Sequence, residues 1–261
     1  MNPVLSEILR TKQVLKRDGT AIPLNYNISE QEGATIQQAI RQVRPRVTLE
    51  IGMAYGISTL FICEALREVG GERHIVIDPA PIEGWLEVGL YNVERAGYSS
   101  LIDLHNESSH RVLPALEREG RRVGVAVIDG WHTFDYAFVD FFYVDRLLDT
   151  GGIVIFDDTR YYPAVRKVAR YVAEHRRYEP LANDSTHPPS ARRAWFERLT
   201  SVLRRPALLP LTTPLLRPDV LRPDSRIRLP LDNHIAFRKI SDDLLGDGSN
   251  GTRRWDQHVD F

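Results

Sequence analysis

Apolar positions in this chain fall either in short unbroken runs or in stripes at helical spacing. Two unbroken runs occupy residues 125–128 and 153–156. Short β-branched runs of this kind are typical of strands that are buried on both faces of a parallel sheet. About a helix's worth of residues separates them, and Gly151–Gly152 is a helix-stop signal. We therefore predict a strand–helix–strand unit with parallel strands.

Carboxylates follow both of these runs. Asp129 ends the first run, and Asp157 and Asp158 end the second. Parallel pairing places both strand ends at the same edge of the sheet. Three carboxylates gathered there require a cation, or one of them must take up a proton.

The same alternation extends along most of the chain. Further strands are predicted over 47–51, 74–79, 101–104, 178–181 and 234–240, with helices over 58–66, 85–96 and 164–175. Short connections between strands and helices predict a doubly wound α/β sheet, in which ligands bind outside the carboxyl ends of the strands. Residues 1–44 are expected to be helical and polar, with an interruption near Asp18–Gly19. Ser29 and Glu32 have the spacing of a capping box, and Pro45 ends that helix.

A glycine-containing turn follows the first predicted strand of the sheet. Its pattern, E-x-G-x-x-x-G-x-S, starts at Glu50 and differs from the dinucleotide fingerprint and from the phosphate-cradling loop that ends in Lys. It favours a nucleotide-like ligand without a polyphosphate, although a tight turn without a ligand is the plain alternative. Asp78 closes the next strand, where an acidic residue can accept both ribose hydroxyls or simply face solvent. Ser108 and Ser109 could bond an adenine edge or cap the helix that follows.

Composition narrows the class of protein. The 261 residues fit one large domain or two small ones, and the net charge of −1 favours neither nucleic acid nor a membrane surface as partner. The single cysteine, Cys63, excludes an internal disulfide framework and a cysteine-based zinc site. Neither a signal peptide nor a spanning segment is visible, so a cytoplasmic protein is expected.

The second half of the chain contains a proline- and arginine-rich stretch. Eight of the 16 prolines lie within 183–230, and residues 160–228 contain 15 Lys and Arg against 6 Asp and Glu. We predict one amphipathic helix over 190–205, and a lid or an interaction surface for the whole insert. The apolar residues within 208–221 suggest either a lid or self-association, so a homo-oligomer is one of the two alternatives. A single domain is expected, with a helical cap over 1–45, a core over 46–182, the insert over 183–230, a final strand within 231–245 and a flexible tail over 246–261.

Four motifs together resemble a known family. They are LEIGMAYGIS, IDP, IDGWH and LLDTGGIVIFDD, and the resemblance covers roughly residues 25–180 plus the final strand. The chain resembles the class I S-adenosylmethionine-dependent methyltransferases. It is most similar to the metal-dependent small-molecule O-methyltransferases of the catechol and macrocin or sugar kind. The resemblance implies a Rossmann-like, mostly parallel seven-stranded sheet.

The resemblance also implies roles for individual residues. For the cofactor, the implied contacts are Ile28, Glu50, Gly52, Ala54, Ser58, Asp78, Ser108, Ser109, Asp129 and Trp131. Within this set, the first glycine loop would line the methionine half, Asp78 would hold the ribose, and Trp131 would pack on the adenine. Mg²⁺ or another divalent cation would be bound by Asp129, Asp157 and Asp158. His132 stands where the catechol enzyme has its lysine base, and Asp158 replaces an amide ligand; both are departures.

The expected function is magnesium-dependent O-methylation of a hydroxylated small molecule of the natural-product or sugar type, with His132 and Asp129 as catalytic residues. One alternative is an oxidative enzyme on the same fold, like the cephalosporin hydroxylases. A non-haem iron site needs two histidines and a carboxylate as ligands. The motifs contain no such set, which argues against this alternative. A second alternative is a non-catalytic protein that binds the cofactor or a partner.

Overall fold

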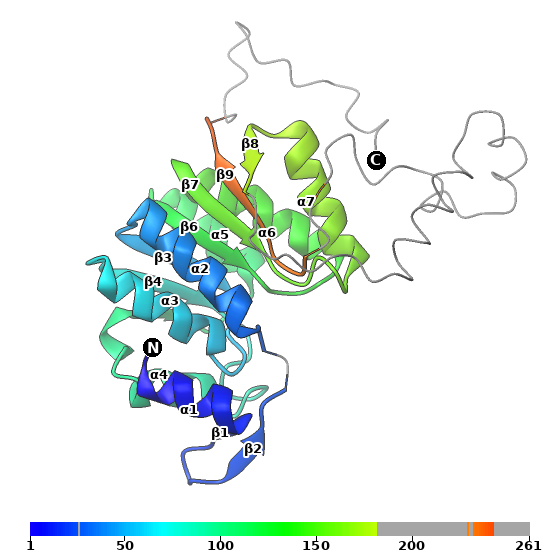
Figure 1. The fold of residues 1–261 in the computed structure, drawn as a ribbon. Helices are drawn as coiled ribbons and strands as arrows, with labels where there is room; N and C mark the ends of the chain where they lie inside the picture. The colour runs from blue at the N-terminus through cyan, green and yellow to red at the C-terminus, as the bar shows by residue number, and fades with distance from the viewer. Residues whose placement is uncertain (26, 182–228, 230–231, 243–261) are drawn as a thin grey trace, which may run out of the picture.

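The computed structural model describes residues 1–25, 27–181, 229 and 232–242. Figure 1 shows these residues as a central sheet with helices on both sides. The predicted helix over 190–205, the role of the insert over 183–230 and the tail over 246–261 lie outside the described residues. Among the described residues, no helix is both long and apolar enough to cross a membrane.

Seven strands form the main sheet, in the order β5-β4-β3-β6-β7-β9-β8. Their bounds are β3 (Val47–Ile51), β4 (Arg73–Ile77), β5 (Ile102–His105), β6 (Val123–Ile128), β7 (Leu148–Phe156), β8 (Tyr178–Pro180) and β9 (Ile235–Lys239). β3 to β7 pair in parallel, whereas β9 runs antiparallel to both β7 and β8. The predicted doubly wound, mostly parallel, seven-stranded sheet is confirmed. The strand order reverses between β3 and β6, where open α/β sheets bind their ligands.

Helices cover both faces of the sheet. One face carries α1 (Pro3–Thr11), α2 (Glu30–Val43), α3 (Ile57–Glu68) and α4 (Val88–Arg95), and the other α5 (Ser109–Arg118), α6 (Phe134–Leu147) and α7 (Pro163–His175). A short 3₁₀ helix, η1 (Ser99–Leu101), precedes β5. In Figure 1, α2 and α3 lie across β3 and β4, with α5 and α6 behind the sheet. Each helical layer shares a separate hydrophobic core with its face of the sheet.

The unbroken apolar runs follow from these two cores. Val125 and Val127 of β6 contribute to the core beneath α2 and α3, whereas Ala126 and Ile128 contribute to the core beneath α5 and α6. Since successive side chains of a strand point to opposite faces, a strand covered on both faces must be apolar at every position.

The predicted helical stretch with an interruption near Asp18–Gly19 is confirmed for α1 and α2, but the interruption is longer than expected and is itself structured. Between α1 and α2 lies an antiparallel hairpin, β1 (Gln13–Leu15) and β2 (Ala21–Pro23). Its turn is closed by a hydrogen bond from Lys16 N to Thr20 O, and Gly19 adopts a φ of 87° within it. Strands of three residues are too short to show an alternating pattern, which is why only the interruption was visible in the sequence.

The predicted capping box of α2 is confirmed. Glu32 N donates to Ser29 Oγ at 3.2 Å, and Ser29 N donates to Glu32 Oε2 at 2.6 Å. The helix ends at Val43, two residues before Pro45.

Two predicted boundaries differ from the structure by three residues or more. β7 starts at Leu148 and runs through Gly151–Gly152, so the glycines belong to the strand rather than to the end of α6. α4 starts at Val88 instead of residue 85, because Leu86 and Glu87 both have positive φ angles and cannot continue a helix.

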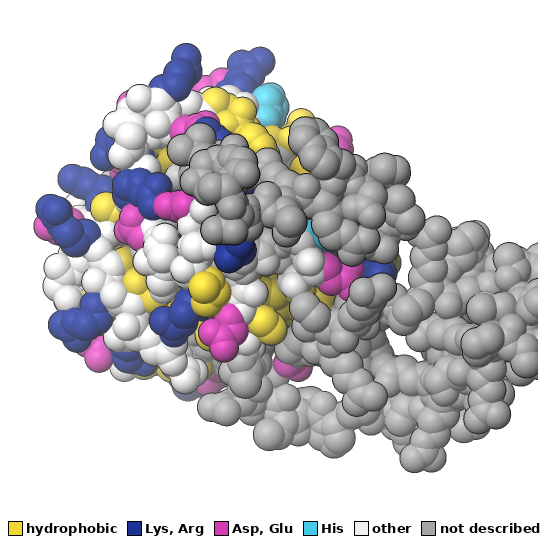
Figure 2. Space-filling model, turned by 90° about the horizontal axis from the view of Figure 1, so that it is seen from above, with side chains coloured by type: hydrophobic (Ala, Val, Ile, Leu, Met, Phe, Trp, Pro, Cys, Tyr) yellow, Lys and Arg dark blue, Asp and Glu magenta, His cyan; other side chains and the backbone are white. Residues whose placement is uncertain are grey.

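Charges of both signs are mixed on the face of the molecule seen from above (Figure 2). Figure 2 shows Lys and Arg side chains interspersed with Asp and Glu on the face seen from above, wherever described residues form that face. A single-signed patch, which would attract a polyanion over a large area, is not visible among them.

Candidate active site

A cavity of about 660 Å³ opens at the carboxyl ends of β3, β4, β6 and β7. It lies on the edge of the sheet where the ligand site was predicted. Eleven of the residues predicted from the sequence line it: Ile28, Gly52, Ala54, Asp78, Ser108, Ser109, Asp129, Trp131, His132, Asp157 and Asp158. Residues separated by up to 130 positions are thus brought together by the parallel strands.

Two predicted cofactor residues, Glu50 and Ser58, do not line this cavity. Glu50 is fully buried in β3, where it accepts a hydrogen bond from Thr59 Oγ1 at 2.5 Å and lies 3.3 Å from His74 Nε2. Ser58 is buried in the first turn of α3. In this structure, therefore, Glu50 joins β3 to α3 and to β4 from beneath the glycine loop.

Gly52 lets the loop after β3 approach the end of β6. Its φ is 91°, and a Cβ added to it would lie 2.0 Å from the backbone oxygen of Asp129. Only glycine fits such a contact, because any side chain would collide with backbone atoms that cannot move aside. The tight turn at Gly52 thus places the loop against the acidic edge.

Asp78 organises the same loop from the end of β4. Its Oδ2 accepts hydrogen bonds from Met53 N at 2.9 Å and Ala54 N at 3.1 Å, and its Oδ1 accepts one from Ala80 N at 2.8 Å. A carboxylate has about four lone-pair sites, so this one keeps capacity for hydroxyl donors. Asp78 therefore holds the loop in place and can still accept ligand hydroxyls.

Further polar, aromatic and aliphatic side chains also line the cavity. Ser108 occupies the N-cap position of α5, but its side chain makes no capping hydrogen bond there. Ser108 therefore does not cap the helix through its side chain, which was the alternative to ligand binding. Trp131 is 67 % exposed, and Ile28, which is buried, lines the cavity from the segment before α2.

The three predicted carboxylates do meet at one rim. Burial, together with repulsion from Asp157 and Asp158, raises the pKa of Asp129 well above its usual range. Burial and the neighbouring Asp157 likewise raise the pKa of Asp158. Asp158 also has a φ of 58°, a costly conformation for a residue other than glycine. Mutual repulsion of this kind is relieved by a bound cation.

Within the rim, the ligand-type atoms form two groups. Atoms of Asp129, His132 and Asp158 all lie within 4.8 Å of one another, as do atoms of Glu32, Asp157 and His234. In the first group, His132 Nε2 is 3.3 Å from Asp158 Oδ2, and the His132 ring packs on Tyr162 with 4.2 Å between centroids. In the second, His234 Nε2 lies 2.9 Å from Asp157 Oδ1.

Several residues of the rim were missed by the sequence argument. Asn233 Nδ2 donates to Asp157 Oδ1 at 2.9 Å and to Asp158 Oδ1 at 3.1 Å. Asn233 and His234 precede β9, which is antiparallel, so the start of that strand meets the carboxyl ends of the parallel strands. No motif marks these two residues, and their distance from Asp157 in the chain hides the contact.

The histidines of the rim can be compared with the pair of histidines that a non-haem iron site requires. His234 adds a second histidine to the rim beside His132, which the motifs alone did not reveal. Among the described residues, however, the two histidines fall in separate groups, each with two carboxylates. Neither group has the two histidines and one carboxylate of such an iron site.

Comparisons with known proteins find relatives of this chain. A family model described as "Methyltransferase domain" matches residues 49–159. The caffeoyl-CoA O-methyltransferase of Petroselinum crispum is 28% identical over 162 residues, which cover 57% of this chain and 62% of the relative. Caffeoyl-CoA O-methyltransferase 1 of Arabidopsis thaliana is 30% identical over 160 residues, 55% of this chain and 57% of the relative. The chain thus spans about six tenths of the length of these relatives.

Solved structures show the same architecture. The O-methyltransferase of Bacillus cereus in complex with SAH has a TM-score of 0.57 at 19% identity, covering 69% of this chain and 83% of that one. TomG of Streptomyces achromogenes, an O-methyltransferase in complex with SAM, has a TM-score of 0.56 at 19% identity, covering 69% and 82%. The fold is the Rossmann-like class I methyltransferase fold, and the predicted resemblance to class I O-methyltransferases is confirmed.

Proposed function

We propose that this chain, which resembles the class I O-methyltransferases and shares their fold, is an S-adenosylmethionine-dependent O-methyltransferase acting on a hydroxyl group of a small molecule. The observation that carries the proposal is one cavity that is lined on one side by Asp78 and Ser108, which follow β4 and β5, and on the other by Asp129 and Asp158, which follow β6 and β7. A methyl donor and a hydroxyl acceptor need adjoining sites of these two kinds. The acceptor is proposed to be of the natural-product or sugar type.

The cofactor would occupy the end formed by the glycine loop and the carboxyl end of β4. Asp78 would accept the ribose hydroxyls, Ser108 and Ser109 would meet the adenine edge, and the exposed Trp131 would pack on its ring. When bound, S-adenosylmethionine supplies a methyl group on a sulfonium centre, which an oxygen nucleophile takes by in-line displacement. Gly52 and Ala54 expose the backbone of the loop to the cofactor, and Ile28 excludes water from above.

The acidic rim fits a hard divalent cation. Its donors are carboxylate oxygens, which Mg²⁺ and Mn²⁺ prefer, and the raised pKa values of Asp129 and Asp158 reflect repulsion that a cation would relieve. Asp129, Asp157 and Asp158 are proposed to hold it. When bound, such a cation lowers the pKa of a coordinated hydroxyl and fixes its oxygen. Asn233 orients the two carboxylates of β7 through its amide.

His132 is proposed as the general base. Its ring is partly exposed to the cavity, lies beside Asp158 and is held by Tyr162. A neutral imidazole can accept the hydroxyl proton as the oxygen becomes a nucleophile. The carboxylate of Asp158 would stabilise the imidazolium that forms.

Calorimetry and chelation test this proposal. Wild-type protein should bind S-adenosylhomocysteine, methylate at least one member of a panel of hydroxylated small molecules, and lose activity in EDTA that added Mg²⁺ or Mn²⁺ restores. Asp129→Ala and Asp158→Ala should abolish transfer, whereas Asp135→Ala, an exposed acid in the first turn of α6, should not.

Each part can fail separately. Full transfer by both variants in chelator-treated buffer would exclude the metal mechanism. Binding of S-adenosylhomocysteine without transfer to any acceptor would favour a non-catalytic binding protein.

A further inference from the structure

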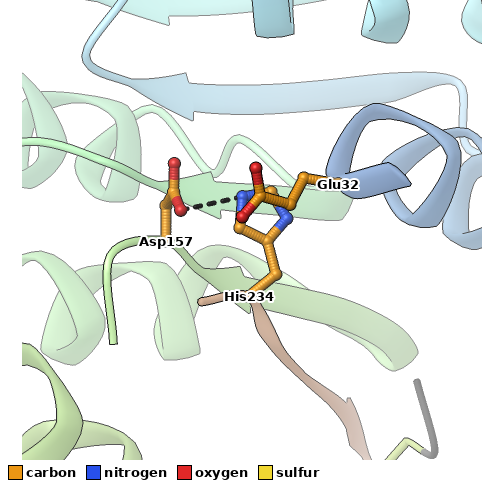
Figure 3. A group of neighbouring side chains, drawn as sticks. All are labelled: Glu32, Asp157 and His234. Atoms are coloured by element: carbon orange, nitrogen blue, oxygen red, sulfur yellow. Dashed lines mark ion pairs between the residues drawn. The ribbon is translucent and has the colours of Figure 1, made fainter. Parts of the chain in front are cut away.

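Glu32 makes contacts on two sides. Its Oε2 accepts the backbone N–H of Ser29 at 2.6 Å and so completes the capping box of α2. An oxygen of the same carboxylate lies within 4.8 Å of ligand-type atoms of His234 and Asp157. Figure 3 shows the three side chains grouped together. Capping needs only the hydrogen bond to Ser29.

His234 lies between two carboxylates from different parts of the chain. Its side chain is 2 % exposed, and its Nε2 is 2.9 Å from Asp157 Oδ1. In Figure 3, Glu32 reaches toward the ring from α2, while Asp157 reaches it from the end of β7. The imidazole therefore connects a helix on one face of the sheet with the rim at the sheet edge.

The residues directly before Ser29 line the cavity. Asn27 and Ile28 are both part of its wall, and Asn27 Nδ2 donates to the backbone oxygen of Ile28 at 2.7 Å. Ile28 is buried. A continuous set of neighbouring groups thus leads from Asp157 through His234 and Glu32 to Ser29 and the covering segment.

We propose that Glu32 is a positioning residue that, through His234, fixes the segment 27–29 over the cofactor end of the cavity relative to the carboxylate rim. The inference rests on the proposed function, since the cofactor is what the segment would cover. A segment held in its bound position before the ligand arrives loses less conformational freedom on binding, which improves affinity. Glu32 itself would touch neither the cofactor nor the acceptor, so it acts only through its neighbours.

Glu32→Gln separates the two contacts. Glutamine also completes a capping box, so the variant keeps the helix start and loses only the charge that faces His234. Glu30→Gln is the matched control, because Glu30 is an exposed acid in the same helical turn. Calorimetry with S-adenosylhomocysteine should show a Kd about tenfold higher for Glu32→Gln and within about twofold of wild type for Glu30→Gln. With an acceptor, KM for S-adenosylmethionine should rise while kcat is retained.

A double-mutant cycle with His234→Gln tests the route of the effect. If Glu32 acts through His234, adding Glu32→Gln to His234→Gln should weaken binding no further. The inference would be overturned if Glu32→Gln lowered the affinity of the His234→Gln protein by a further tenfold. It would also be overturned if Glu32→Gln alone bound with wild-type affinity.

Ser29→Ala separates capping from positioning, because it removes the cap and keeps the Glu32 charge. It should lower thermal stability yet leave the Kd within about threefold of wild type. A loss of affinity equal to that of Glu32→Gln would show that only helix capping matters.

Hydrogen exchange keeps this inference distinct from the proposed function. Glu32→Gln should speed exchange of the backbone amides of residues 27–29 in the protein without ligand, and Glu30→Gln should not. If wild-type protein fails to bind S-adenosylhomocysteine, the proposed function fails, while faster exchange would still show that Glu32 positions the segment. Unchanged exchange in a protein that does bind would overturn the positioning role alone.

Discussion

At the scale of single residues, Asp140 is unusual because it is buried behind the cavity wall without lining it. It lies on α6 and is 1 % exposed, and a Cβ added to Gly130 would be 3.2 Å from its Oδ2. Among the described residues, neither carboxylate oxygen has a well-formed hydrogen bond. Burial raises the pKa of Asp140 to about 6, and the nearby Ser109 hydroxyl only partly offsets it.

The raised pKa predicts the pH dependence of stability. The folded state binds the Asp140 proton more tightly than the unfolded state, in which the pKa of this carboxyl is 3.8. The resulting stability is fully present below pH 3.8 and is lost as the pH rises through about 6. Asp140→Asn should therefore gain about 2–3 kcal/mol over wild type at pH 8 and show little difference near pH 4. Urea melts at the two pH values measure this; equal differences at both would contradict it.

His132 is the residue on which the proposed chemistry depends most. His132→Gln should lower kcat about 100-fold or more at neutral pH, because the hydroxyl proton loses its acceptor. Binding of S-adenosylhomocysteine should change little. His110→Gln, an exposed histidine at the start of α5, is the control. If His132→Gln retains kcat, the base lies elsewhere.

At the scale of elements, the turn after β3 depends on one glycine. Gly52→Ala would need a positive φ and would also place its Cβ against the Asp129 backbone, so it should cost at least about 3 kcal/mol and abolish cofactor binding. Gly97 also has a positive φ, but an added Cβ would meet nothing within 4 Å. Gly97→Ala should thus cost only about 1–2 kcal/mol. Equal losses in denaturant melts would contradict the close approach.

Elements with strong local patterns could be predicted from the sequence. The buried parallel strands were visible because both faces demand apolar side chains, and α2 because Ser29 and Glu32 specify its start. The hairpin before α2 was not visible, since three-residue strands carry no period. The start of β7 was misplaced because Gly151–Gly152 follows the pattern of a helix end, although residues on either side of these glycines, Leu148 and Ile153, pair with β6.

From the apolar pattern alone, without the family resemblance, the site was predictable only where a polar residue follows a strand directly. Asp78, Asp129 and Asp157 each come immediately after an apolar run, so topology alone brings them together. His234 and Asn233 instead precede an antiparallel strand, and nothing in their neighbours indicates which edge they reach. Glu50 is the first residue of the glycine-loop motif, yet its side chain is buried beneath the loop and does not line the cavity.

At the scale of the whole molecule, a buried lysine joins the last strand to three other elements. Lys239 of β9 is fully buried, and its Nζ donates to the backbone oxygens of Asp145 at 2.5 Å and Leu148 at 3.0 Å. Asp145 also accepts a hydrogen bond from Tyr178 Oη at 2.7 Å. The ends of α6, β7, β8 and β9 thus share one polar cluster.

This cluster should be important for global stability. Lys239→Met would leave the Asp145 and Leu148 carbonyls without their donor, and should cost about 3 kcal/mol. Asp242→Asn removes a partly exposed partner of the same lysine, 2.6 Å away, and should cost no more than about 1 kcal/mol. Thermal unfolding of both variants measures the contrast. Equal, small losses would show that water replaces the lysine.

The strand order β7-β9-β8 has a consequence for synthesis on the ribosome. β8 pairs only with β9 among the described strands, and β9 is separated from it by more than 50 residues. During translation, β8 therefore emerges long before its pairing partner, and Asp157 and Asp158 emerge even longer before Asn233 and His234. The nascent chain can form most of its sheet early, but ligand binding should appear only once the final strand has left the exit tunnel.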